Sequence, residues 1–211
     1  MPRSARTIPT RDIHSDKRDN VCVAAIRVFI EDGYGASMDK IAAEAGVAKQ
    51  TLYNQFGSKE RLFAEVIRQS VDTITLTLEE PGLNLRAALL RFAKVFRERA
   101  LSAHGLGLHR ALIAEAPRFP KLARMIHEQG AASAQATLAK FLGRAMAAGD
   151  LAVSDPQFAA ELLMSMLTGY ERVRLLYGVK ADPTSLSEAE KQMAIVDCFL
   201  RGFAVSFAMR N

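Results

Sequence analysis

The sequence predicts an all-α protein of about nine helices, in which a small helix-turn-helix unit precedes a larger helical unit. Apolar residues recur at helical spacing through most of the 211-residue chain, whereas the alternation typical of strands is nearly absent. Glycine, proline and capping residues stand mostly between these periodic stretches, where helices would end. The two observations together predict the fold class.

Four helices are expected in the N-terminal part, at about 17–31, 38–45, 48–56 and 59–79. Gly33 can end the first helix, and Ser37 is placed to cap the second. Gly46-Val47 makes the turn before the third helix, Gly57 ends that helix, and Ser58 can cap the fourth. Two short helices joined by a brief turn that contains glycine are typical of a helix-turn-helix.

Five further helices are expected, at about 84–100, 105–115, 119–147, 156–177 and 187–208. Asp155 followed by Pro156 is typical of an N-cap with proline at the first helical position. Ser187 and Glu190 fit a capping box. Pro81-Gly82 separates the two sets of helices. The expected division is a flexible arm, the helix-turn-helix unit and the larger helical unit, over residues 1–16, 17–65 and 66–211.

The third helix has one apolar and one polar face. Leu52 and Phe56 fall on the inward side, and Ala48 is expected beside them. Gln50 and Asn54 fall directly opposite. The helix carries no carboxylate, as expected of a surface that meets phosphate, because an acid would repel it. The other polar side chains flank the outward side: Lys49, Thr51, Tyr53 and Gln55.

These outward side chains have the chemistry that DNA recognition uses. Lysine can meet a phosphate or a guanine edge, amides can pair with adenine, and hydroxyl groups can donate to phosphate oxygens. The second helix of a helix-turn-helix enters the major groove, which here is the helix at 48–56. Ser37 and Lys59 each stand at a helix start and are candidates to bind phosphate. An amide-rich surface helix without a DNA partner is the alternative interpretation.

Residues 21–63 resemble the DNA-binding domain of the TetR family of bacterial transcriptional regulators. The residues that carry the resemblance, with gap-free spacing, are Phe29, Gly33-Tyr34-Gly35, Ile41-Ala42, Ala45-Gly46-Val47, Leu52-Tyr53, Phe56 and Ser58-Lys59-Glu60. The resemblance implies base contacts by Lys49 and Gln50. It also implies phosphate contacts by four residues: Ser37, Tyr53, Gln55 and Lys59. Ala48 and Asn54-Gln55 depart from the residues common in the family, so the backbone contacts are expected to differ.

The charge of the chain is weak evidence for a nucleic acid. A net charge of +5 permits a polyanionic partner without requiring one. Residues 1–61 hold ten Lys and Arg against eight Asp and Glu, so the excess is not concentrated there. Acidic residues also dilute the N-terminal arm, so a solvated tail is as reasonable as minor-groove binding. The basic residues of the arm are Arg3, Arg6, Arg11, Lys17 and Arg18.

The last two helices are apolar over more than one face, which predicts that both sides are buried. A second copy of the chain is the economical partner, since two copies would also suit a DNA site with two-fold symmetry. A place inside the chain's own core is the alternative. The residues expected at the dimer interface are Ala159, Leu163, Met166, Tyr170, Val196, Phe199, Leu200 and Phe203.

Residues from about 105 to 148 resemble the C-terminal domain of AefR-like proteins, in the AcrR branch of the same family. The resemblance implies a small effector bound between the helices of the larger unit. We expect an apolar or aromatic effector, although a plain hydrophobic core would carry many of the same residues. The candidate pocket residues are Phe92, Phe96, His109, Leu112, His127, Phe141, Met164, Leu167, Tyr170 and Arg174.

Other classes of protein find little support. The chain has no nucleophile elbow, no glycine loop that could cradle phosphate and no metal-ligand spacing, so neither an enzyme, a metal nor a cofactor is expected. No apolar stretch could span a membrane and no signal-peptide core begins the chain, so a cytoplasmic location is expected. Cys22 and Cys198 lie on apolar sides of the expected helices and should be buried free thiols, a redox switch being the alternative.

Residues and resemblance together predict a ligand-responsive, DNA-binding transcriptional regulator. The expected form is a repressor that binds a near-palindromic operator on double-stranded DNA as a homodimer. A small apolar or aromatic effector would release it. The alternative is a DNA-binding dimer without an effector, acting as a constitutive repressor or an activator.

Overall fold

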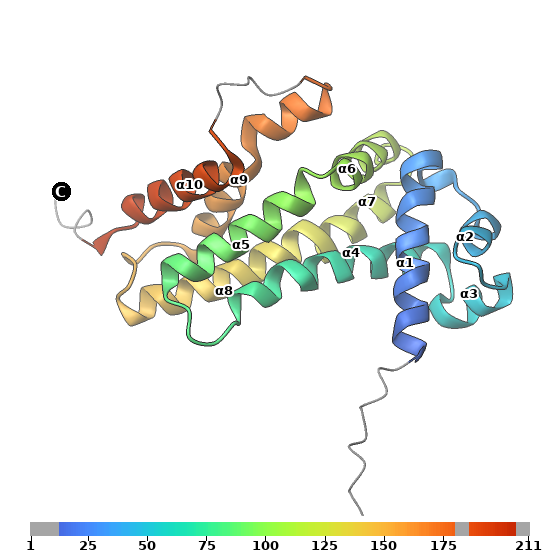
Figure 1. Ribbon diagram of the computed structural model, residues 1–211, viewed down its shortest axis with the longest axis horizontal. Coiled ribbons are helices and arrows are strands. Elements are labelled where there is room, and N and C mark those ends of the chain that lie inside the picture. Colours follow the sequence, from blue (N-terminus) through green and yellow to red (C-terminus); the bar gives the residue numbers. More distant parts are fainter. Residues whose placement is uncertain (1–12, 180–185, 206–211) are drawn as a thin grey trace, which may run out of the picture. The chain divides into compact units, whose positions relative to one another are not determined.

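The computed structural model describes residues 13–179 and 186–205, and all regular structure in these ranges is helical (Figure 1). The all-α fold class is therefore confirmed. The chain falls into two compact units, residues 1–66 and residues 67–211. Arg3, Arg6 and Arg11, the outer basic residues of the predicted arm, lie outside the described residues.

The first unit is built from three helices and the start of a fourth. The helices are α1 (Ile13–Asp32), α2 (Met38–Glu44), α3 (Lys49–Phe56) and α4 (Lys59–Thr75), with a 3-10 turn, η1 (Gly33–Gly35), after α1. The helix-turn-helix is therefore α2 and α3, as predicted. The first helix begins at Ile13, four residues before the expected start at residue 17.

The starts of α2 and α4 are capped as the sequence predicts. The Ser37 hydroxyl accepts a hydrogen bond from the Lys40 amide at 3.1 Å. The Ser58 hydroxyl accepts one from the Arg61 amide at 3.3 Å. The start of α3 differs, because Ala48 is its N-cap and makes no side-chain hydrogen bond. Ala48 is also exposed, so its predicted inward position is wrong: a residue outside the first turn no longer follows the periodicity of the helix.

The core of the first unit fixes which face of α3 is inward. Leu52 is fully buried and Phe56 is 5% exposed, so one stripe of α3 packs inward. Phe29 of α1 and Phe63 of α4 meet edge to face in the same unit, with ring centroids 4.6 Å apart. Ile41 of α2 is fully buried as well. This packing leaves the opposite face of α3 to the solvent.

The second unit begins at Ile67 within α4 and contains six further α-helices. A 3-10 turn, η2, follows α4, and a π-helical turn, η3, lies between α7 and α8. They are η2 (Leu76–Leu78), α5 (Leu85–Ala100), α6 (Ala103–Glu115), α7 (Pro120–His127), η3 (Glu128–Ala132), α8 (Ser133–Ala148), α9 (Pro156–Leu176) and α10 (Glu188–Gly202). The run α7-η3-α8 is unbroken and corresponds to the single helix expected at 119–147. Counted this way, the described residues form the nine helical runs that were predicted.

Apolar side chains from several helices share one core in the second unit. In this unit α8 packs against α9 and α5 packs against α10 (Figure 1). Phe92, Leu142, Leu163 and Phe199 are all at most 2% exposed within this cluster. The core explains why α9 and α10 are apolar on one side without any partner subunit.

The caps of α9 and α10 are confirmed, whereas the end of α10 differs. Asp155 accepts from the Gln157 amide at 2.9 Å, with Pro156 at the first helical position. Ser187 and Glu190 form the predicted capping box. The last helix ends at Gly202 and not at residue 208, and residues 206–208 lie outside the described residues.

Helix α9 bends at Gly169, whose φ of 29° and ψ of −132° are not helical. This positive φ favours glycine because a Cβ atom would be strained there. The bend frees the Leu167 carbonyl, which accepts a hydrogen bond from the buried guanidinium of Arg97. Arg97 also pairs with Glu171 at 2.6 Å and with Glu188 at 2.8 Å. The guanidinium thus ties α5 to the second half of α9 and to the start of α10.

The two cysteines differ from one another. Cys22 is 2% exposed in the core of the first unit, as predicted. Cys198 is exposed on α10, so its predicted burial is wrong. Helical spacing marks the apolar side of α10, but it cannot tell which apolar residues reach the core. None of the helices in the described ranges is long and apolar enough to cross a bilayer.

Candidate functional site

The outer face of α3 presents a compact set of polar side chains. Five of the six predicted outward residues are exposed: Lys49, Gln50, Thr51, Tyr53 and Asn54. Tyr53 keeps 39% of its surface exposed. Because Leu52 and Phe56 anchor the opposite stripe, this face is held on a rigid helix and not on a loop.

Two of these residues are linked to each other. Gln50 Nε2 donates a hydrogen bond to Asn54 Oδ1 at 2.9 Å, one helical turn away. The pair lies directly opposite the buried stripe of α3. It leaves the Gln50 carbonyl oxygen and the Asn54 amide group to bond elsewhere, which is the donor and acceptor set that pairs with an adenine edge.

Lys49 meets an acid that the sequence pattern did not reveal. Its ammonium group lies 2.9 Å from the carboxylate of Asp39, in the first turn of α2. The hydrogen bond that Lys49 donates to Asp39 raises the pKa of Lys49, so the lysine is cationic at neutral pH. Both side chains are more than half exposed, so the ion pair is weak and water or a phosphate can compete with it.

The predicted phosphate residues Ser37 and Lys59 are brought together. Lys59 Nζ, at the start of α4, donates to the Ala36 carbonyl at 3.2 Å. Ala36 precedes Ser37 directly, so the starts of α2 and α4 lie side by side. Amide groups at two helix starts and an ammonium group therefore converge, which is the arrangement that binds an anionic backbone.

Gln55 and Arg18 are held differently from the other candidates. Gln55 is half-buried, and its Oε1 atom is buried without a hydrogen-bond partner. The structure therefore does not place this oxygen on the exposed face. Arg18 belongs to α1, where it pairs with Glu65 at 3.3 Å and lies over the Phe56 ring. It is thus part of the folded unit and not of a flexible arm.

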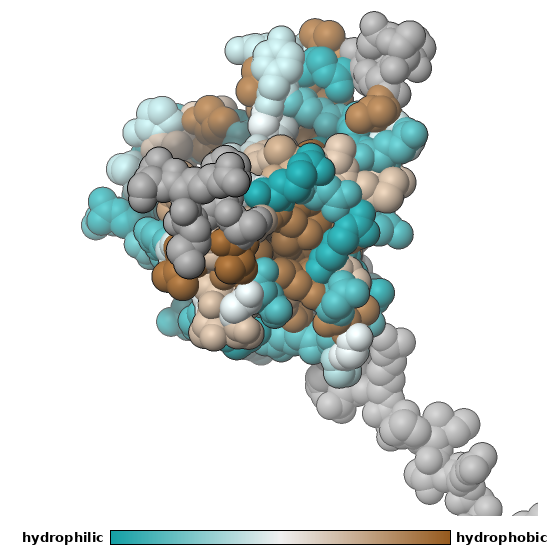
Figure 2. Space-filling view, turned by 90° about the vertical axis from the view of Figure 1, so that its left-hand side faces the viewer, coloured by the Kyte–Doolittle hydropathy of each residue, from teal (hydrophilic) through white to brown (hydrophobic). Residues whose placement is uncertain are grey.

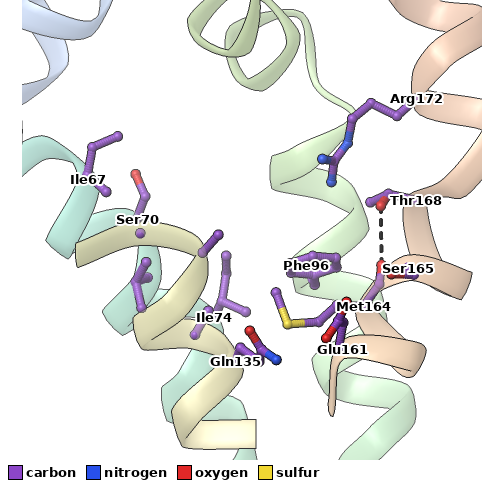
Figure 3. Close-up of a pocket in the computed structure, with 14 residues that line it drawn as sticks. Ile67, Ser70, Ile74, Phe96, Gln135, Glu161, Met164, Ser165, Thr168 and Arg172 are labelled. Atoms are coloured by element: carbon purple, nitrogen blue, oxygen red, sulfur yellow. Dashed lines mark hydrogen bonds between the residues drawn. The ribbon is translucent and has the colours of Figure 1, made fainter. Parts of the chain in front are cut away.

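The second unit contains two neighbouring cavities. One, of about 340 Å³, lies among α4, α5, α8 and α9, with η3 at its edge (Figure 3). The other, of about 350 Å³, lies among α4, α6, α7 and η3. They share three wall residues, Ile67, Gly130 and Ala131. A Cβ at Gly130 would stand 3.0 Å from the Ile67 side chain, so only glycine fits this dividing wall without displacement.

Half of the predicted pocket residues line these cavities. Phe96 and Met164 line the first, and His109, Leu112 and His127 line the second. The other five do not line them. Phe92 and Leu167 are fully buried in the core, and Phe141 packs against it. Tyr170 is 82% exposed, and Arg174 is engaged with Glu171 at 3.5 Å.

The residue that sequence reasoning missed is Arg172, which lines the first cavity (Figure 3). Its Nε atom is buried and has no hydrogen-bond partner. Met164, Thr168 and Arg172 recur at a spacing of four along α9, and all three line the cavity. Extending the spacing from Met164 would therefore have selected Arg172 in place of Arg174.

The expected dimer residues divide into two groups. Ala159, Leu163, Val196 and Phe199 are at most 2% exposed within the chain's own core, so they are wrong as interface residues. Met166, Leu200 and Phe203 pack partly against the same core. Tyr170 is the exposed member of the predicted set, and other large apolar side chains are exposed along α9 on both sides of the Gly169 bend. These residues, here called the α9 outer face, are Phe158 and Leu162 before the bend, Tyr170 and Val173 after it, and Tyr177 directly after the end of α9.

Exposed apolar side chains are also found outside α9. Figure 2 views the left-hand side of Figure 1 and shows hydrophobic residues in the middle of that face, bordered by hydrophilic ones. On α10 itself Met193 is 42% exposed. A protein surface with several large exposed apolar side chains commonly marks an interaction site.

Comparisons with known proteins cover both units. Residues 22–66 match the model of the bacterial regulatory proteins of the tetR family. Residues 87–205 match the model of the C-terminal domain of AefR-like transcriptional repressors. The transcriptional activator FasR from Mycolicibacterium smegmatis is 42% identical over 60 residues. That match covers 28% of this chain and only 27% of FasR.

Solved structures match along nearly the whole chain. A TetR-family transcriptional regulator from Mesorhizobium loti MAFF303099 is 29% identical, with a TM-score of 0.73. The match covers 92% of this chain and 100% of that one. The flavonoid-responsive regulator FrrA is 34% identical over 90% of this chain and 95% of its own, with a TM-score of 0.67. The chain therefore belongs to the TetR family of DNA-binding bacterial transcriptional regulators.

Proposed function

We propose that the chain acts as a homodimeric repressor in the cytoplasm, which binds a near-palindromic operator and is released by a small effector. The outer face of α3 is proposed to read bases through Lys49, Gln50 and Asn54. Ser37, Thr51, Tyr53 and Lys59 are proposed to hold the backbone. Gln55 has a lesser part in this proposal because its amide oxygen is buried.

The observation that carries the proposal is the exposed polar face of α3 beside two converging helix starts. The face combines an exposed amide pair, which can read bases, with a lysine and helix amides, which can bind phosphate. Direct readout requires such groups on a rigid element that fits the major groove. An α-helix anchored by two buried side chains meets that requirement.

Dimer formation is supported by the α9 outer face. Its residues are apolar and large, and Tyr170 and Tyr177 are each more than 80% exposed. Aromatic side chains of this kind supply much of the binding energy in protein interfaces. A two-fold dimer would also match two half-sites about one helical turn of DNA apart.

The two cavities support a response to a small molecule. Both have volumes at the lower end of the range for ligand pockets, and their walls are mainly apolar. Helix α4 carries Lys59 near its start and Ile67 and Val71 further along, and the latter two line the first cavity. We propose that effector binding shifts α4, for which a coupling of about 1–3 kcal/mol suffices. FrrA is named a flavonoid-responsive regulator, and since flavonoids are aromatic this similarity supports an aromatic effector here.

Repression, and not activation, is proposed because of what the second unit is similar to. The model that matches residues 87–205 is that of a repressor. FasR is an activator, but its similarity is confined to 60 residues. An effector-independent DNA-binding dimer is the alternative, and the presence of two cavities favours the responsive form.

The proposal can be tested by selecting bound sequences from a pool of random double-stranded DNA. The expected result is one enriched motif made of two inverted half-sites, whose centres are about 10 base pairs or a multiple apart. Enrichment of a single half-site would contradict the dimer. The absence of any enriched motif would contradict sequence-specific binding.

A further inference from the structure

Arg172 lies in the wall of the first cavity and has no counter-ion among the residues that the structure describes. Its Nε atom is buried and unpartnered, and none of the carboxylates in the described ranges forms an ion pair with it. Burial lowers the pKa of Arg172, and an arginine remains cationic. A half-buried cation whose Nε atom is buried without a partner is costly, and a ligand that supplies an acceptor would remove that cost.

Two other arginines of the same unit, in contrast, have partners for their charge. Arg97 is 2% exposed and bonds to two carboxylates and a carbonyl. Arg174 lies 3.5 Å from Glu171 and donates to the Val179 carbonyl at 3.2 Å. The local acids are thus already engaged with other cations, and Arg172 is left to face the cavity.

The guanidinium of Arg172 is turned from α9 toward the cavity (Figure 3). The walls around it are mainly apolar, with Ile67 and Ile74 of α4 and Phe96 of α5 among them. Glu161 is the acid that lines this cavity, but it is exposed and lies at the opposite end from Arg172 (Figure 3). The cavity therefore has one cationic end and a hydrophobic body.

The neighbouring cavity adds no negative charge at this end. His109 lines it, and both burial and the charge of Arg172 lower the pKa of His109. The influence of Arg172 on His109 means that the two groups are close enough to interact. No acid lines this second cavity. An anion placed beside Arg172 would thus meet no opposing carboxylate.

We propose that the first cavity binds an amphipathic organic acid, whose carboxylate pairs with Arg172 and whose aliphatic or aromatic body fills the apolar walls. The planar guanidinium can pair with both oxygens of a carboxylate. This inference rests on the proposed ligand response and makes it more specific: the effector is an apolar acid and not a neutral apolar molecule.

The test compares acids with their neutral primary amides at pH 7. The probes are octanoate with octanamide and 3-phenylpropanoate with 3-phenylpropanamide, measured by isothermal titration calorimetry and thermal unfolding without DNA. For the wild type we expect at least one of the acids to raise the unfolding temperature and to bind about tenfold or more tightly than its amide. Equal binding of acid and amide, or no binding of either acid, overturns the proposal.

Variants of the protein test which residue causes the preference for the acid over the amide. Arg172→Gln should lower the affinity for the acid to that for the amide, whereas Arg172→Lys should keep part of the preference because it keeps the charge. Arg144→Gln is the matched control, since Arg144 is an exposed arginine on α8 that does not line either cavity. An acid preference that survives Arg172→Gln would assign it to another residue and overturn the proposal.

A parallel DNA-release assay separates this inference from the proposed function. If the amides also release bound DNA, the ligand-responsive function stands and the inference about the acid group fails. If the wild type binds no DNA sequence selectively, the proposed function fails, and the calorimetric comparison still decides the ligand class by itself.

Discussion

At the scale of single residues, an acid on another helix partly neutralises the positive charge on the polar face of α3. Asp39 of α2 stands 2.9 Å from the Lys49 ammonium group and raises its pKa. A carboxylate near a DNA-binding surface repels phosphate and also occupies the lysine. Asp39 therefore lowers general affinity for DNA and leaves more of the discrimination to the amide pair, Gln50 and Asn54.

This account predicts that Asp39→Asn tightens binding to every DNA sequence, by about three- to tenfold at low salt, because it removes a negative charge that repels phosphate. The slope of log affinity against log salt should steepen by up to about 0.9, the value of one phosphate contact. Fluorescence anisotropy of labelled DNA measures both. Glu44→Gln is the control, since Glu44 is an exposed acid that pairs with Arg27. Unchanged binding of Asp39→Asn would place this residue away from the DNA.

Residue-level features were predictable where helical spacing decides them. Leu52 and Phe56 are buried because they recur on one side of α3, and Ser37 caps α2 because its hydroxyl stands directly before the helix. The ion pair of Asp39 and Lys49 joins two helices, and the angle between helices is set by tertiary packing. Spacing along one helix could not reveal it.

At the scale of elements, the second half of α9 depends on Arg97. The Gly169 bend interrupts the helix, and the guanidinium of Arg97 then bonds to the carbonyl of Leu167 and to two glutamates. This arrangement could not be predicted from the sequence, because residues 97, 171 and 188 are far apart in the chain. For the same reason α9 was expected as one uninterrupted helix.

Arg97→Met should lower the free energy of unfolding by about 3–5 kcal/mol, because it leaves the partly buried Glu171 carboxylate without its principal partner. Urea denaturation followed by circular dichroism measures the change. Arg86→Met is the matched control: Arg86 pairs with Asp197 at the surface, where such a pair contributes about 0–1 kcal/mol. Equal effects of the two substitutions would contradict the role given to Arg97.

The same cluster predicts a pH dependence. Burial opposes ionisation of Glu171 and Glu188, but hydrogen bonds from Arg97 and Lys191 prevail and lower both pKa values below 4.5. The folded state therefore releases these protons more readily than the unfolded state. The resulting stability is present above pH 4.5 and is lost as the pH falls through the lowered pKa values. Denaturation between pH 6 and pH 3 should show a steeper loss for the wild type than for Arg97→Met, and parallel curves would contradict this.

At the scale of the whole molecule, the α9 outer face is proposed to bring two chains together. The sequence predicted that α9 and α10 are apolar on more than one side, and on α9 large apolar residues do lie both in the core and at the surface. It could not assign each side, because core and interface both select apolar residues. Ala159 and Leu163 therefore belong to the core, whereas Tyr170 lies outside it.

Tyr170→Asp should weaken dimerisation by about tenfold or more, since it places a charge in the centre of an apolar surface. Analytical ultracentrifugation should then show the 23.1 kDa chain in place of a dimer. Val153→Asp is the control, because Val153 is 88% exposed but lies outside α9 and α10. A dimer of unchanged stability in Tyr170→Asp would mean that another surface joins the chains.

The central claim is that the exposed face of α3, with the start of α4, binds a specific DNA site. Its most direct test is fluorescence anisotropy of the wild type, Lys49→Ala and Lys59→Ala on selected and scrambled DNA across a salt series. Lys49→Ala should lose the preference for the selected site, whereas Lys59→Ala should weaken binding to both DNAs and reduce the salt slope by about one. If both variants bind as the wild type does, the DNA-binding face has been assigned to the wrong surface.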